Sequence, residues 1–465
     1  MRKRMMKKWT VVLAALGVLL TALASCTGPS PTAAPTEAPT EATTAAPTAA
    51  PTAAPTEAPT EAPTKAVLPA DKILTEYPDY RFDHEPTTDE LRQTVIRAMN
   101  DMLSVQWVTP MDFDYTKSGA ASSKQYAFYS GAKYAGLIYT SVNTNLFGFL
   151  EYYDRETGNL NIDAFEANTS TPNSLGMKIS AKIGNTCTGC TNWAYYTVCT
   201  SITGGMVSYS QTKRNGFIPV GDYTYDFSIL EWAMTGKKVT TNMVCEAEGK
   251  QKIYECYALA LPADVLVHQP EDRSNGHSMM VIENPVVVRN EDGTINGAKS
   301  YVMIQDQRTG TYEVKDPETG NVHLYSGRVS YQYSFSKLFE EAYLPMTTAE
   351  LLGEKAYVAP EVTLAGVETV SNAEDLGKAK VRCNYPISAM HLVAVDASGN
   401  RTVICRKAFG RDDVNEKQAF APKLSSFSSN LTRFDLAPGT YRIVLEVIPS
   451  TGGVYTPVTF DYTVN

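Results

Sequence analysis

The chain has 465 residues and a formal net charge of −9, with 41 Lys and Arg against 50 Asp and Glu. An acidic balance disfavours a polyanionic partner, so we do not expect nucleic-acid binding. The chain is longer than one ordinary domain, and the globular part behind its N-terminal region is best divided into two units.

Residues 1–25 have the features of an export signal, with a basic start, an apolar run over 11–20 and small residues before Cys26. The apolar core is too short to cross a bilayer. The ending Leu23-Ala24-Ser25-Cys26 resembles the lipobox of bacterial lipoproteins. That resemblance implies a lipid on Cys26 and a place on the extracellular face of the cytoplasmic membrane. An ordinary cleaved signal with a chance cysteine is the alternative.

Residues 26–65 repeat Ala-Pro-Thr-Glu-Ala-Pro-Thr and close variants, without an aromatic side chain. Such a composition cannot bury enough apolar surface to offset the entropy of ordering, which predicts an extended, disordered linker. At about 3.1 Å per residue in a polyproline conformation it spans on the order of 100 Å. A lipid-anchored domain on this linker reaches into the cell wall.

The first globular unit, 66–355, opens with a helix. Thr87 and Glu90 have the spacing of a capping box, and apolar residues recur at helical period from Leu91 until the predicted end near Trp107. The short apolar runs that follow the cysteine motif, separated by Gly, Asn and Asp, predict strands. They are 261–266, 277–282 and 301–307. The order of helices first and strands after indicates an α+β unit.

The sequence Thr186-Cys187-Thr188-Gly189-Cys190 runs into a helical segment, so Cys187 is expected in a first helical turn. The helix dipole lowers the pKa of a thiol at that position. A cysteine hydrolase also needs an imidazole and a polar group that orients it. We assign these roles to His277 and Asp306. Side chains alternate along a strand, so Gln305 or Gln307 is an alternative orienting residue.

These residues resemble papain-like bacterial wall hydrolases, the NlpC-type endopeptidases and CHAP-type amidases. The similar motifs, in chain order, are Gly136-Leu137-Ile138-Tyr139, Thr186-Cys187-Thr188-Gly189, Pro262-Ala263-Asp264-Val265, Gly276-His277-Ser278 and Gln305-Asp306-Gln307. The resemblance implies a papain-like core, with helices packed on an antiparallel sheet. It also implies cleavage of amide bonds in peptidoglycan, and a substrate-binding role for Tyr139. Thr186, Thr188 and Ala263 depart from the Asp, Ser and Gly of that pattern, and longer separations leave substrate identity open.

Each assigned residue has a simpler interpretation. Cys187 could be a buried structural thiol, His277 a histidine at a strand edge, and Cys190 the nucleophile instead. A catalytically inactive surface binding or adhesion lipoprotein is therefore the alternative function. Cys187 and Cys190 form a Cys-x-x-Cys pair, which could indicate a redox or zinc site. The sequence has no second pair of ligands for a zinc ion, so we expect no metal and no other cofactor. The remaining histidines are expected at the surface or in the core.

The second unit, 356–465, changes to alternating strand patterns with Gly, Pro, Asn and Asp turns. This sequence pattern predicts an all-β antiparallel sandwich. The segment Leu436-Ala437-Pro438-Gly439-Thr440-Tyr441 resembles the entry to a strand in immunoglobulin-like bacterial modules. Cys383 and Cys405 lie on predicted neighbouring strands and could pair. Without Cys26 seven cysteines remain, and this odd number leaves at least one thiol free.

Overall fold

Helix α2 (Thr88–Ser104) begins with the expected capping box, in which Thr87 accepts from the Glu90 backbone and the Glu90 carboxylate accepts from the Thr87 backbone. It ends at Ser104, earlier than the predicted end near Trp107. Val105 is extended, and Trp107 belongs to strand β1 (Gln106–Val108), where its ring stacks on Tyr134 at 4.8 Å. The chain thus leaves the helix at Val105 and enters a strand before Trp107.

The computed structural model describes residues 73–114, 127–140, 142, 144–167, 179–204, 215–223, 239–269, 276–308, 312–315, 322–325 and 329–465. The expected signal peptide (1–25), Cys26 and the linker (26–65) lie outside these residues and stay predictions. No helix in the described ranges combines the length and the apolar character that crossing a membrane requires.

Among the described residues, six strands form one antiparallel sheet in the order β13-β10-β9-β8-β14-β7. They are β7 (Phe217–Pro219), β8 (Val265–His268), β9 (His277–Val281), β10 (Tyr301–Asp306), β13 (Val329–Ser334) and β14 (Tyr343–Thr348). Strands β9 and β10 confirm the predicted runs within a residue. The first run was predicted too early, because 261–264 form a turn and β8 starts only at Val265.

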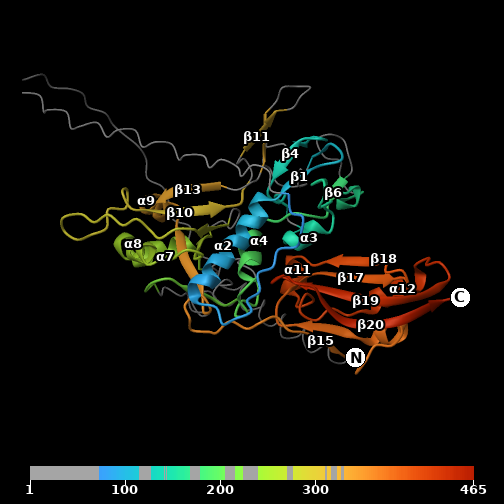
Figure 1. The fold of residues 1–465 in the computed structure, drawn as a ribbon. Coiled ribbons are helices and arrows are strands. Elements are labelled where there is room, and N and C mark those ends of the chain that lie inside the picture. Colours follow the sequence, from blue (N-terminus) through green and yellow to red (C-terminus); the bar gives the residue numbers. More distant parts are fainter. Residues whose placement is uncertain are drawn as a thin grey trace, which may run out of the picture. The chain divides into compact units, whose positions relative to one another are not determined.

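Helix α4 (Cys187–Tyr195) packs against both α2 and β9, and Figure 1 shows α2 and α4 side by side. The Thr191 hydroxyl of α4 is hydrogen-bonded to the Ser278 hydroxyl of β9 at 2.9 Å. Helices α7 (Thr241–Glu248) and α8 (Lys250–Ala258) pack against β14, and α9 (Phe335–Glu340) against α8. Helices and an antiparallel sheet thus make an α+β unit.

Shorter elements complete this part of the chain. They are β2 (Phe113–Asp114), β3 (Ala127–Phe128), β4 (Lys133–Ala135), α3 (Leu146–Leu150), the 3-10 helix η1 (Ile162–Ala164), β5 (Phe165–Ala167), β6 (Ile179–Ala181), β11 (Tyr312–Lys315) and β12 (Val322–Tyr325).

The C-terminal part, 356–465, contains an antiparallel sheet in the order β18-β17-β19-β20 and a pair β15-β16. Their bounds are β15 (Val362–Ala365), β16 (Lys380–Cys383), β17 (Ile387–Val395), β18 (Arg401–Ala408), β19 (Gly439–Pro449) and β20 (Tyr455–Val464). The antiparallel strands that the alternating pattern predicts are present. The expectation of an all-β unit needs correction, because this part also contains helices α10 (Ala373–Lys378), α11 (Arg411–Asn415) and α12 (Ser425–Arg433).

The suggested pairing of Cys383 and Cys405 is wrong, since both thiols are free. Cys383 ends β16, which pairs only with β15 in its sheet, whereas Cys405 lies on β18 of the other sheet. The two parts of the described chain share one hydrophobic core cluster, and Tyr385 and Ser450 donate hydrogen bonds to backbone carbonyls just beyond α4. The C-terminal part therefore contacts the segment that directly follows α4, the helix that begins with Cys187.

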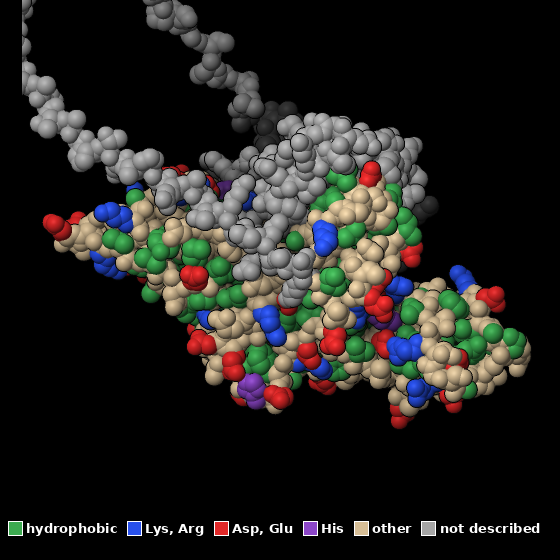
Figure 2. Space-filling model, turned by 45° about the horizontal axis from the view of Figure 1, so that its top comes forward, with side chains coloured by type: hydrophobic (Ala, Val, Ile, Leu, Met, Phe, Trp, Pro, Cys, Tyr) green, Lys and Arg blue, Asp and Glu red, His purple; other side chains and the backbone are tan. Residues whose placement is uncertain are grey.

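The face in Figure 2 carries acidic and basic side chains interspersed among polar ones, without a continuous field of one sign among the described residues.

Candidate active site

Cys187 is the first residue of α4. The helix starts there because Thr186 is extended and its hydroxyl accepts from the Gly189 backbone N–H at 3.2 Å, which satisfies one of the free donors of the first turn. The backbone N–H of Cys187 itself has no acceptor within the helix, as holds for every first-turn residue. The position thus combines a thiol with the positive end of a helix dipole.

Tyr139 lies beside this thiol. A parallel β-bridge between Tyr139 and Asn185 holds the two segments together, and the Tyr139 hydroxyl donates to Cys187 Sγ at 3.7 Å. Burial and the neighbouring sulfur raise the pKa of the Tyr139 phenol, so the hydroxyl stays protonated and available as a donor.

His277 opens β9 and Asp306 ends β10, and the antiparallel pairing of these neighbouring strands brings the two side chains together. His277 Nε2 lies 2.9 Å from Asp306 Oδ1 and 3.0 Å from Oδ2. The charge of the imidazole lowers the pKa of the Cys187 thiol, and the sulfur in turn raises the pKa of His277, so the two groups are close enough to interact. Asp306 and Cys187 are thus both partners of His277 in one cluster.

Strand register separates Asp306 from its two glutamine neighbours. Gln305 donates to Asn100 of α2, and Gln307 donates to the Leu137 carbonyl at 3.1 Å. Both amides point to the opposite side of β10, since successive side chains alternate. Of the three polar residues considered, Asp306 is the one that contacts His277.

The electrostatics favour a charged pair. Burial by itself raises the pKa of the Cys187 thiol, but the charge and hydrogen bond of His277 outweigh it, and the net effect lowers this pKa below its usual value. Burial lowers the pKa of His277, but Asp306 and Cys187 outweigh it and raise this pKa well above its usual value. Both shifts run in the direction that a thiolate–imidazolium pair requires.

Cys190 lies one helical turn further and is fully buried. Burial raises the pKa of its thiol well above the usual value, so it stays protonated and is a poor nucleophile. Across the described ranges, no three or more His, Cys, Asp or Glu side chains are grouped in a way that could hold a metal ion.

The motif Pro262-Ala263-Asp264 forms a tight turn into β8. Ala263 has a left-handed φ of +72°, at the position where the resemblance expects glycine. The buried Asp264 carboxylate accepts from the Leu261 backbone and from Arg92 of α2, both at 2.8 Å. This turn therefore ties the start of the sheet to α2 and has no direct contact with the thiol.

Three residues around His277 and Asp306 were missed by the motifs. The Tyr331 hydroxyl on β13 donates to Asp306 Oδ2 at 3.4 Å, Arg308 Nε lies 3.5 Å from the same oxygen, and the Tyr343 ring is edge-on to His277 at 6.5 Å. Tyr331 is opposite Ile304 in the β10–β13 register, which places its side chain on the Asp306 face. Only the strand pairing reveals the two tyrosines, whereas the short spacing from Asp306 to Arg308 is a signal that could have found the arginine.

Comparisons of the chain with family models, with curated proteins and with solved structures returned no significant match.

Proposed function

We propose that this protein is a surface-anchored cysteine hydrolase, an endopeptidase or amidase, that cleaves amide bonds in peptidoglycan. The observation that supports the proposal is the cluster of Cys187, His277 and Asp306, in which Asp306 binds the imidazole, the thiol pKa is lowered and the imidazole pKa is raised. A nucleophile, a base and an orienting carboxylate are the groups that acyl transfer through a thioester requires.

In this mechanism the Cys187 thiolate attacks the carbonyl carbon of the amide and forms a C–S bond. The oxyanion accepts from the backbone N–H of Cys187, with the Tyr139 hydroxyl close by. The intermediate collapses, the C–N bond breaks, and the leaving amine takes the proton of the His277 imidazolium. Water then attacks the thioester while His277 removes its proton. A C–O bond forms, the C–S bond breaks, and release of the carboxylate product leaves the thiolate and the imidazolium. Asp306 holds the ring orientation throughout.

Two further features support the papain-like interpretation of the core. The nucleophile begins a helix that packs on an antiparallel sheet, and the base and the carboxylate lie on neighbouring strands of that sheet. The left-handed turn at Ala263 has the conformation that a glycine of the family motif supplies. The lipid anchor on Cys26, the linker and the immunoglobulin-like character of 356–465 belong to the same proposal.

One observation favours the alternative of a surface binding or adhesion protein that does not cut. Cys187 is only 3 % exposed, so a substrate carbonyl reaches the sulfur only when neighbouring groups move aside. The two functions share the fold and differ in turnover.

The test is digestion of purified peptidoglycan and its soluble muropeptides by the full-length protein, followed by mass spectrometry of the products. We expect new amine and carboxylate ends with the wild type and none with Cys187→Ala. The matched control is Cys405→Ala, which removes a free thiol on β18. Equal turnover by the Cys187→Ala variant contradicts the assignment, and bound but uncut peptide favours the alternative.

A further inference from the structure

Arg308 lies on the solvent side of the candidate site. It follows Asp306 at the end of β10, and its side chain is 50 % exposed, compared with 19 % for His277 and 0 % for Asp306. Exposure therefore increases from the buried carboxylate and imidazole toward the guanidinium. A ligand that approaches His277 from solvent meets this positive charge close to the reacting groups.

Neutralising Asp306 does not explain the arginine. His277 Nε2 already lies within 3.0 Å of both Asp306 oxygens, and Tyr331 donates to one of them. A guanidinium dedicated to a carboxylate makes two parallel bonds of about 2.7–2.9 Å. Arg308 instead approaches Asp306 at 3.5 Å through Nε, the nitrogen nearest the chain. This contact leaves the fork of the two terminal nitrogens to other partners.

The Tyr331 ring packs against the guanidinium of Arg308. The guanidinium carbon of Arg308 lies 4.9 Å from the centroid of the Tyr331 ring, within the range of a cation–π contact. An arginine that stacks on an aromatic ring loses less freedom when it forms further hydrogen bonds. A pre-oriented, half-exposed guanidinium suits bidentate recognition of a planar carboxylate.

We propose that Arg308 is a specificity-determining residue that binds a free carboxylate of the substrate, next to the amide bond that is cut. The substrate class is a peptide with an anionic carboxyl group near the scissile amide, as opposed to its uncharged carboxamide form. This inference rests on the proposed hydrolase function, and the site that it adds is separate from the reacting thiol.

The test compares a synthetic wall-type peptide that carries a free α-carboxylate beside the scissile amide with the same peptide as a carboxamide. For the full-length wild type we expect kcat/KM for the carboxylate form to be about 10- to 100-fold higher, which one bidentate charged pair supplies. In Arg308→Met the difference falls to within threefold, through a higher KM for the carboxylate peptide. Arg308→Lys restores part of the preference, since it keeps the charge but loses the fork.

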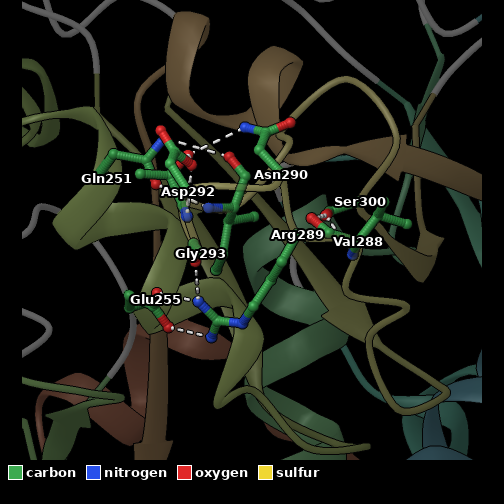
Figure 3. Close-up of polar contacts among 10 residues, drawn as sticks. Gln251, Glu255, Val288, Arg289, Asn290, Asp292, Gly293 and Ser300 are labelled. Atoms are coloured by element: carbon green, nitrogen blue, oxygen red, sulfur yellow. Dashed lines mark hydrogen bonds and ion pairs between the residues drawn. The ribbon is translucent and has the colours of Figure 1, made fainter.

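The matched control is Arg289→Met. Arg289 lies in the loop between β9 and β10 and is bound by both oxygens of Glu255, at 2.8 and 2.9 Å (Figure 3). Its removal tests the loss of one positive charge away from the site, and we expect the preference to stay at the wild-type value. An unchanged preference in Arg308→Met overturns the proposal. So does a fall in kcat alone with a shifted pH profile, because Arg308 then acts through Asp306.

A binding measurement separates this proposal from the hydrolase function. In the Cys187→Ala background, calorimetry with the two peptides is expected to show about tenfold weaker binding of the carboxylate form when Arg308→Met is added. If binding weakens in this way but the wild type shows no turnover, the hydrolase function is refuted and the carboxylate-binding site is supported. Turnover without any dependence of binding on Arg308 refutes the carboxylate site alone.

Discussion

His391 on β17 and Glu151, the residue directly after α3, form an ion pair in which Nε2 lies 2.5 Å from Oε2. The other ring nitrogen faces Glu446 of β19 at 3.4 Å, and Arg401 in turn binds Glu446. Burial lowers the pKa of His391, but the two carboxylates outweigh it and raise this pKa to about 9. This histidine, expected only as a surface or core residue, links the C-terminal sheet to the part that contains the candidate site.

This pair makes stability depend on pH in a defined window. The pKa of His391 is raised above the unfolded value of about 6.5, so its stabilisation is complete below pH ~6.5 and is lost as the pH rises through about 9. The loss is on the order of 3 kcal/mol. We expect the difference in unfolding free energy between wild type and His391→Gln, from urea titrations, to shrink by this order from pH 6 to pH 9.5.

His84 provides the comparison for that experiment, because it contacts Asp83 and Glu90 in a solvent-exposed position. Solvent screens such pairs, so His84→Gln is expected to change stability far less at either pH. A His391→Gln difference that stays constant from pH 6 to pH 9.5 refutes the charged bridge.

Two arginines test the difference between buried and exposed ion pairs. Arg92 and Asp264 have side chains that are 4 % and 2 % exposed, whereas Arg289 and Glu255 are 48 % and 49 % exposed. Arg92→Met leaves a buried carboxylate without its partner, and we expect a loss of about 3–5 kcal/mol. Arg289→Met is expected to destabilise the protein far less, because solvent screens its exposed pair. Chemical denaturation of both variants measures this, and equal losses contradict the predicted role of burial.

The lowered pKa of the Cys187 thiol predicts a pH profile for alkylation. The pKa of this thiol is lowered, with His277 as the favourable charge, so reaction with iodoacetamide is expected to persist at pH values where an ordinary thiol is protonated. Without the imidazole, burial and the charge of Asp306 both raise the pKa of this thiol against the smaller effect of the Tyr139 hydrogen bond, so His277→Ala is expected to move the midpoint above the ordinary value. Mass mapping of the labelled cysteine follows the rate. If only Cys190 is labelled, Cys190 and not Cys187 is the nucleophile.

Asp306→Asn tests the orienting carboxylate. The amide removes the negative charge that raises the pKa of His277, so both the ring orientation and the ion pair with Cys187 weaken. We expect kcat on muropeptides to fall about 10²- to 10⁴-fold, as for other orienting carboxylates in triads. Asp292→Asn, in the exposed turn that binds Thr294, is the matched control and is expected to retain wild-type turnover. Comparable loss in both variants means that Asp306 has no special role.

Local chemistry alone determined several features of this protein. The capping box of Thr87 and Glu90, the helix that begins at Cys187, and strands β9 and β10 follow from spacing and periodicity over a few residues. These signals are short-range, because a cap or an alternating strand is defined by atoms within about one turn or one strand.

Tertiary structure decided what the spacing left open. Pairing of β9 with β10 brings Asp306, and neither neighbouring glutamine, to His277, and β13 adds Tyr331 on the same face. The tertiary structure also has α2 ending before Trp107, Cys383 and Cys405 unpaired, and helices in the C-terminal part. The physical reason is that strand register and side-chain packing depend on contacts between residues far apart in the chain, which local patterns do not encode.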